Sequence, residues 1–332
     1  MKLDVFTHIL PAAYFEVLKE VIPDKAMLKR WPGIPTLWDL DAHLRMMDAY
    51  DDYAQVLSLA NPVIEALGPP DKTPGYARLA NDGLAELCRK HPDRFPAFTA
   101  SMPMNNPDAA AREAERAIDQ LGARGIQVFT NVLGKPLTAP EFFPLFEICA
   151  KRDLPVWMHP IRGPNHPDYL AETKSEDEVW FTFGWPWETT VAMTRLVFSG
   201  LFDRLPDLKV ITHHMGGMIS FNRGKIGWSF EQNFGATSDP RIEKAGLKRP
   251  PEDYFRGFYA DTALNGAAAP TVCGLDFFGP EHALFATDAP FDKEGGHFLI
   301  RETIKVVDEL AISKADREKI YSGNTKRILK LG

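Results

Sequence analysis

The sequence predicts an α/β fold, specifically a (β/α)8 TIM barrel with insertions after strands 1 and 5. Short apolar, β-rich runs alternate with helix-like stretches along 332 residues. This alternation is typical of parallel strands joined by helices, because a parallel pair needs a long crossover connection. The length suits one barrel with long loops, so we expect a single domain over residues 1–332.

The apolar runs give eight candidate strands, the number that a barrel of this kind requires. They are residues 3–6, 55–59, 95–99, 126–129, 155–158, 210–212, 257–260 and 283–286. Helix signals fall between them. Asn106 precedes a helix that we expect to end near Gly122, and Pro140 opens another toward Arg152.

Two segments are longer than the repeat requires, residues 10–52 and residues 160–186, and each directly follows a strand. Insertions after barrel strands lie at the catalytic face and typically build a pocket or lid. A role as a barrel cap or subunit contact explains them equally well. Both interpretations stay open at this point.

Composition excludes several classes of protein. Hydrophobic residues make up 45% and charged residues 25%, as in an ordinary globular chain. The net charge of -7 argues against nucleic-acid binding, which depends on clustered Lys and Arg. Three widely spaced cysteines indicate inert thiols in a reducing compartment. No apolar run is long enough for a membrane span and no secretory signal is present, so we expect a cytoplasmic protein.

Polar side chains follow the predicted strands at the point where each strand ends. Active sites of barrels lie at this C-terminal rim. A single histidine after an apolar strand is more often a packing residue than a ligand. Several imidazoles and carboxylates at one rim are costly to bury without a bound group, so the set favours a functional site. Its members are His8, His159, His213, His214, Asp261 and Asp288.

His8, His159 and Asp288 suit one divalent metal ion. Two neutral imidazoles and one carboxylate leave a coordination position for water or substrate, which is the pattern of catalytic zinc. Manganese or iron would suit the same donors, so zinc is the favoured ion and the other two are alternatives.

Four sequence blocks resemble the amidohydrolase-2 group of the amidohydrolase superfamily. They are residues 3–8, His159-Pro160, residues 184–226 with Gly-Trp-Pro-Trp-Glu-Thr-Thr and His-Met-Gly-Gly, and Thr-Asp-Ala-Pro-Phe at 287–291. Within that group the chain is similar to aminocarboxymuconate semialdehyde decarboxylase and to aromatic-acid decarboxylases. The resemblance extends over nearly the whole chain and implies a metal-dependent carbon-carbon lyase.

One position departs from the family pattern. Phe6 stands where the resemblance calls for the first histidine of a His-x-His pair, or for a glutamate, and phenylalanine has no donor atom. We expect His8, His159 and Asp288 to hold the metal ion. A metal-free site, as in a lactonase branch of the superfamily, is the alternative.

The resemblance also implies the catalytic roles. His214 matches the histidine that acts as general acid or base, and imidazole suits that role near neutral pH. His213 is interpreted as a neighbour that packs against a helix. Either Asp288 or His214 would protonate the carbon that loses CO2.

Cationic and aromatic side chains are candidates for substrate binding. Arg45, Arg162 and Lys225 are the candidate cations for a substrate carboxylate, and Lys225 matches a cation that reaches across a dimer in the family. Trp187 lies in an aromatic stretch that could line the pocket. The resemblance implies a homodimer.

Three functions compete at the level of sequence. The first is a decarboxylase of a small aromatic or unsaturated carboxylic acid. The second is a hydrolase or hydratase on the same barrel, acting on a lactone, an amide or an unsaturated diacid. The third is a binding protein without catalysis, against which the joint presence of His8, His159, His214 and Asp288 argues. We expect a small carboxylate ligand and neither nucleic acid nor membrane as partner.

Overall fold

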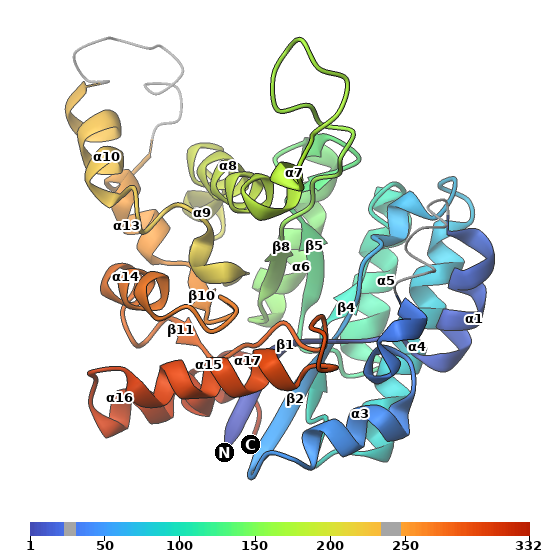
Figure 1. The fold of residues 1–332 in the computed structure, drawn as a ribbon. Helices are drawn as coiled ribbons and strands as arrows, with labels where there is room; N and C mark the ends of the chain where they lie inside the picture. The colour runs from blue at the N-terminus through green and yellow to red at the C-terminus, as the bar shows by residue number, and fades with distance from the viewer. Residues whose placement is uncertain (23–30, 234–246) are drawn as a thin grey trace.

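The computed structural model describes residues 1–22, 31–233 and 247–332, and it confirms the predicted barrel class (Figure 1). Parallel strands pair in the orders β1-β2-β3 and β11-β10-β9-β8-β5-β4. Two features join these sheets into a ring. Val5 N–H donates to Phe285 O at 2.9 Å, which ties β1 to the segment after β11, and β3 is followed almost directly by β4.

Eight strand positions surround the barrel axis, with β3 and β4 sharing one of them. The predicted strands are all present, and their ends differ from the prediction by at most three residues. The bounds are β1 (Lys2–Ile9), β2 (Tyr53–Leu59), β3 (Ala97–Phe98), β4 (Ala100–Ser101), β5 (Ile126–Phe129), β8 (Val156–His159), β9 (Val210–Thr212), β10 (Tyr259–Asp261) and β11 (Ala283–Leu284). A short hairpin of β6 (Asn131–Val132) and β7 (Lys135–Pro136) follows β5.

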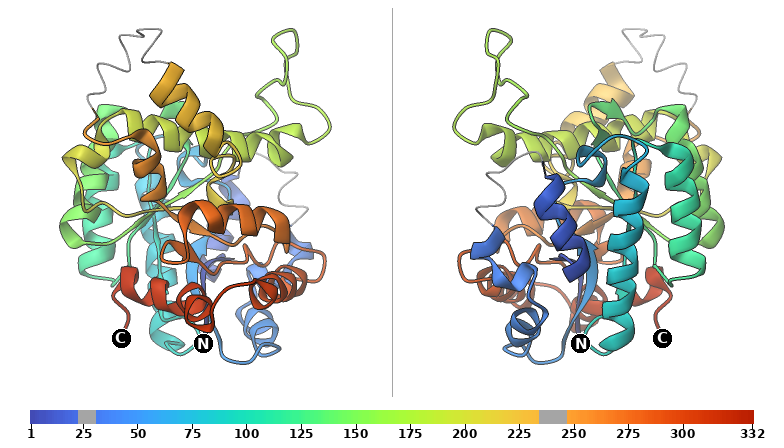
Figure 2. Two further views of the ribbon diagram at one scale, coloured as in Figure 1. Left: turned by 90° about the vertical axis from the view of Figure 1, so that its left-hand side faces the viewer. Right: turned by 90° about the vertical axis from the view of Figure 1, so that its right-hand side faces the viewer.

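Helices wrap the outside of the strands (Figure 2). The side chain of Asn106 accepts a hydrogen bond from the N–H of Ala109, which confirms the predicted start of α5. The bounds are α1 (Ala12–Val21), α3 (Leu40–Met47), α4 (Thr73–Lys90), α5 (Pro107–Asp119), α6 (Phe143–Arg152), α7 (Val179–Thr182), α8 (Gly184–Phe198), α9 (Leu201–Arg204), α10 (Arg223–Gly227), α13 (Pro251–Arg256), α14 (Ala268–Phe278), α15 (His297–Glu309), α16 (Lys314–Glu318) and α17 (Asn324–Leu329).

The barrel interior is filled by side chains from alternate strand positions. Phe6, Trp157 and Ile211 belong to one buried cluster there. The indole of Trp157 donates to Val5 O at 3.2 Å, so it spans the interior from β8 to β1. Gly125 leads into β5 with a φ of 141°, and a Cβ there would lie 2.1 Å from Pro155 O. Only glycine fits this approach of two strands.

The two long segments that follow the first and fifth barrel strands lie in different parts of the molecule. Residues 10–52 contain α1, which packs against α4 in the outer layer, two 3-10 turns and α3; residues 23–30 lie outside the described part. Residues 160–178 form a loop that projects from the end of the barrel opposite the two termini (Figures 1 and 2). Their predicted roles as pocket, lid or subunit contact stay predictions.

The described cysteines are all unpaired, in agreement with the sequence. Burial raises the pKa of the Cys88 and Cys149 thiols to about 12, which keeps both protonated at neutral pH. None of the described helices combines the length and apolar character needed to cross a bilayer.

Candidate active site

His8 lies near the end of β1, and its ring is held from both sides. Nε2 is 2.9 Å from Asp288 Oδ1, and Nδ1 is 3.1 Å from Ser58 Oγ. The Ser58 hydroxyl donates to Thr7 O at 2.8 Å, so its oxygen accepts from Nδ1 of His8. This arrangement fixes the tautomer that leaves the lone pair on Nε2.

Asp288 follows β11 and has a left-handed φ of 64°. That conformation is strained for a residue with a side chain. Its N–H donates to Phe6 O at 3.2 Å, which fixes the turn against β1. Burial alone would raise the pKa of Asp288, but the hydrogen bond to His8 and the nearby imidazoles lower it overall. Asp288 is therefore anionic at neutral pH.

His159 is the last residue of β8 and lies among aromatic rings. Its ring centroid is 5.1 Å from Trp185, 5.5 Å from Phe129 and 6.3 Å from His8. Burial, together with the charges of neighbouring imidazoles, holds its pKa well below the usual range. Nδ1 is buried and has no hydrogen-bond partner within the described part of the chain. A neutral imidazole of this kind is the form that binds a metal ion.

His214 follows β9 in a turn with a left-handed φ of 55°. Its N–H donates to Asp261 Oδ1 at 2.9 Å, and its Nδ1 lies 2.6 Å from Ala263 O. A carbonyl only accepts, so Nδ1 donates and the neutral ring carries its lone pair on Nε2. The ring centroid is 5.7 Å from that of His159. His214 is therefore near the candidate metal ligands and able to take or give a proton.

His213 is fully buried, its Nδ1 is hydrogen bonded to Asp261 Oδ2, and its ring stacks on Phe6 with centroids 3.5 Å apart. Its expected packing against a helix stays a prediction. The sequence did not predict the contact with Asp261, because it depends on the pairing of β10 with β9. A pairing over 48 residues leaves no local signal in the sequence.

The donors fit a divalent ion in chemistry, although the described part of the chain contains no group of three His, Cys, Asp or Glu side chains already arranged to hold one. The 2.9 Å between His8 Nε2 and Asp288 Oδ1 is close to the edge of about 3 Å expected for an octahedron with bonds of about 2.1 Å. Two imidazoles on one ion have centroids at most about 6.5 Å apart, and His8 and His159 meet this limit at 6.3 Å.

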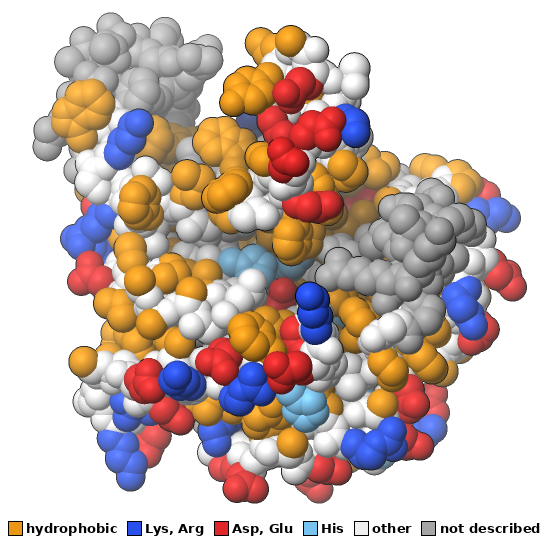
Figure 3. Space-filling view, in the orientation of Figure 1, with side chains coloured by type: hydrophobic (Ala, Val, Ile, Leu, Met, Phe, Trp, Pro, Cys, Tyr) orange, Lys and Arg blue, Asp and Glu red, His pale blue; other side chains and the backbone are white. Residues whose placement is uncertain are grey.

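The space-filling view shows histidine side chains on one face of the molecule (Figure 3). Pale-blue histidine atoms are visible in a hollow in the middle of the face, below the projecting loop (Figure 3).

The candidate substrate-binding residues are not all brought to this hollow. Arg162 forms an ion pair with Glu188 at 2.9 Å, and both side chains are mostly buried. Trp187 is half exposed on α8. Arg45 on α3 and Lys225 on α10 are exposed, and neither makes an ion pair within the described residues. Their roles in binding substrate stay predictions, as does the role of Trp187.

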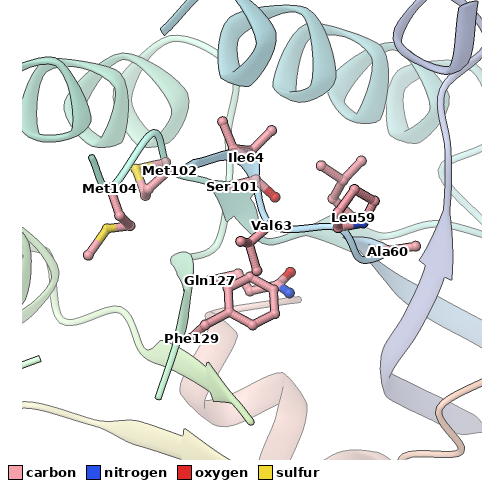
Figure 4. A pocket seen from close by; sticks show the side chains of 10 residues that line it. Leu59, Ala60, Val63, Ile64, Ser101, Met102, Met104, Gln127 and Phe129 are labelled. Carbon is pink, nitrogen blue, oxygen red and sulfur yellow. The ribbon is translucent and has the colours of Figure 1, made fainter. Parts of the chain in front are cut away.

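A small pocket is lined by residues of β2, β4 and β5 and of the segments that follow β2 and β4 (Figure 4). Phe129 belongs to its wall and also contacts the ring of His159, so the pocket and the histidines share this side chain. The wall is mostly apolar, but Gln127 contributes an amide whose Oε1 is buried without a hydrogen-bond partner among the described residues. The remaining residues are Leu59, Ala60, Pro62, Val63, Ile64, Ser101, Met102 and Met104. Sequence reasoning missed this pocket because no motif marks it.

Eight parallel strands with imidazoles and a carboxylate at one rim define an α/β-barrel enzyme with a candidate metal centre. The profile of the amidohydrolase family matches residues 4–331. The chain belongs to this amidohydrolase family, which confirms the resemblance found in the sequence.

Named relatives in the family are decarboxylases. The chain is 33% identical to gamma-resorcylate decarboxylase of Polaromonas sp. over 322 residues, which cover 93% of this chain and 92% of that protein. It is 30% identical to 2-amino-3-carboxymuconate-6-semialdehyde decarboxylase of Dictyostelium discoideum over 299 residues, covering 89% and 77% of the two chains.

A solved structure shows the same fold. A dihydroxybenzoic acid decarboxylase from Polaromonas sp., crystallised with manganese and the inhibitor 2-nitroresorcinol, superposes with a TM-score of 0.81 at 30% identity, covering 99% of this chain and 97% of that one.

Proposed function

We propose that this protein is a metal-dependent decarboxylase that removes CO2 from a small aromatic carboxylic acid. The observation that carries the proposal is the contact of His8 with Asp288 at 2.9 Å, with His159 beside them, at the rim of a family barrel. The named decarboxylases of the family support the reaction class.

Decarboxylation breaks the bond between a ring carbon and the carboxylate, and the electron pair stays on the ring. A proton must therefore reach that carbon, and CO2 leaves. His8, His159 and Asp288 would hold a divalent ion, which would supply positive charge beside the oxygen atoms of the substrate. His214 is the group that we assign to proton transfer, because its Nδ1 is fixed by Ala263 O and its Nε2 is left to exchange a proton.

The walls of the site favour an aromatic substrate. The ring of Phe291 lies 5.1 Å from His8, and the rings of Phe129 and Trp185 lie 5.5 and 5.1 Å from His159. Aromatic walls of this kind pack against a planar ring better than against a flexible chain. Arg162 would meet the substrate carboxylate only by releasing Glu188, so it acts in binding if that ion pair opens.

The finer assignments are part of the proposal. Relatives crystallised with manganese support a divalent ion, so manganese is the first ion to test, and zinc or iron come after it. The homodimer and the cytoplasmic location, which the sequence led us to expect, are proposed on that basis alone.

The test is CO2 release from a panel of hydroxylated benzoic acids, beginning with 2,6-dihydroxybenzoate. Manganese-loaded wild type should release CO2, and chelation or His159→Ala should abolish it. Lactones and amides in the same panel test the hydrolase alternative. Hydrolysed product without CO2 would overturn the proposed reaction.

A further inference from the structure

The starting point is a buried imidazole without a partner for its lone pair. Nδ1 of His213 donates to Asp261, so Nε2 carries the lone pair of the neutral ring. Nε2 is buried and accepts no hydrogen bond from any described group. Leaving such an atom unsatisfied is costly, because the atom has lost its hydrogen bonds to water without replacing them. We infer that a ligand normally meets it.

Asp261 is fixed in a way that suits this role. Its Oδ1 accepts from the N–H of His214 at 2.9 Å and from the N–H of Ala263 at 3.2 Å, while Oδ2 accepts from His213. A carboxylate that orients a histidine through Nδ1 is the usual support of a metal-binding imidazole, because it fixes both the tautomer and the direction of Nε2.

The position of His213 also matches the missing donor. Phe6, which stands where the family resemblance calls for a metal ligand, lies face to face with the His213 ring at 3.5 Å. A metal ion binds in the plane of an imidazole, so packing on the ring face leaves Nε2 free to coordinate. The His213 centroid lies 5.4 Å from His159, within the limit for two imidazoles on one ion.

We propose that His213 supplies the metal ligand that Phe6 cannot, so that a side chain from the end of β9 replaces one from β1. The ion is then held by His8, His159, Asp288 and His213, with Asp261 as the positioning residue for His213. This inference rests on the proposed function only in requiring a divalent ion at the site.

The direct test is anomalous diffraction from crystals of the wild-type protein soaked in MnCl2. The proposal predicts an anomalous peak within about 2.4 Å of His213 Nε2, close to His–metal bond lengths. A peak near His8 and Asp288 with His213 Nε2 more than about 3 Å away would overturn it. Wild type needs no mutation for this test, so loss of folding cannot disturb the result.

Manganese affinity measured by equilibrium dialysis gives a second readout. His213→Ala should weaken binding at least about 100-fold and Asp261→Asn about 10–100-fold. His43→Ala is the matched control, because His43 is equally buried but is bound to Gln55 and Thr36, and it should change the affinity less than about threefold. The double variant Phe6→Glu with His213→Ala should bind manganese at least about tenfold more tightly than the single variant His213→Ala.

The outcomes separate this inference from the proposed function. An unchanged dissociation constant in folded His213→Ala overturns the inference, and so does a wild type that binds no manganese, zinc or cobalt. Metal bound through His213 without CO2 release from any acid overturns the proposed reaction and leaves the inference standing.

Discussion

Asp4 makes the stability of this protein depend on pH. Its side chain is fully buried below the site. It accepts hydrogen bonds from Tyr53 Oη at 2.6 Å, from Thr287 Oγ1 at 2.6 Å, and from the N–H groups of Thr287 and Phe6 at 3.1 and 3.3 Å. Burial outweighs these bonds and raises the pKa of Asp4 to about 7.

The sign and size of the effect follow from this shift. Between pH 4 and 7 the unfolded chain has lost the Asp4 proton and the native state has kept it, so stability falls as pH rises through this window. The gap between the ordinary value of 3.8 and about 7 corresponds to about 4 kcal/mol. Asp4→Asn removes the titration and keeps one acceptor oxygen.

The assay is urea denaturation of wild type and Asp4→Asn from pH 4 to 8, with chelator present so that metal binding does not contribute. The free energy of unfolding of the variant, relative to that of wild type, should rise by up to about 4 kcal/mol from pH 4 to pH 8. Subtracting the wild-type free energy of unfolding from that of the variant at each pH cancels the contribution of the other titrating groups. A difference that stays constant within about 1 kcal/mol from pH 4 to 8 would refute the reasoning.

Three further predictions concern single side chains. Burial raises the pKa of Glu65 to about 7. Glu65→Gln should therefore be more stable than wild type by up to about 3 kcal/mol at pH 8 and about equally stable at pH 4. Curves of unfolding free energy against pH that run parallel for the two proteins would contradict this. His214→Asn should lower kcat about 10²–10⁴-fold and keep bound manganese, and loss of the metal would contradict the assignment. Asp288→Ala should lose manganese in equilibrium dialysis, because it removes the anionic ligand that contacts His8; retained affinity argues against the site.

Much of the fold could be predicted from the sequence because buried parallel strands are continuous apolar runs. The runs at 126–129 and 210–212 coincide with β5 and β9. The split between β3 and β4 could not be foreseen, because it depends on a change of pairing partner from β2 to β5. The end of β1 was missed for a related reason, since its register shift against β2 is a property of the pair.

The site was predictable where a residue follows its own strand, and not where two strands must meet. His8, His159 and Asp288 could be proposed as neighbours because each lies in or shortly after its own strand, and their role as metal ligands stays a prediction. The Ser58 hydroxyl that sets the tautomer of His8 comes from β2, 50 residues away, and carries no motif. The pairing of Arg162 with Glu188 was missed because charge alone does not show which cations are already neutralised.

We propose above all that this chain catalyses metal-dependent replacement of a carboxylate by a proton. The most direct measurement is turnover of 2,6-dihydroxybenzoate in D2O by manganese-loaded protein, with the product analysed by mass spectrometry and CO2 measured in parallel. The account predicts one CO2 released and one deuteron gained at the same carbon for each turnover, both abolished by chelator. Turnover that survives complete removal of the metal, or product that retains its carboxylate, would contradict it.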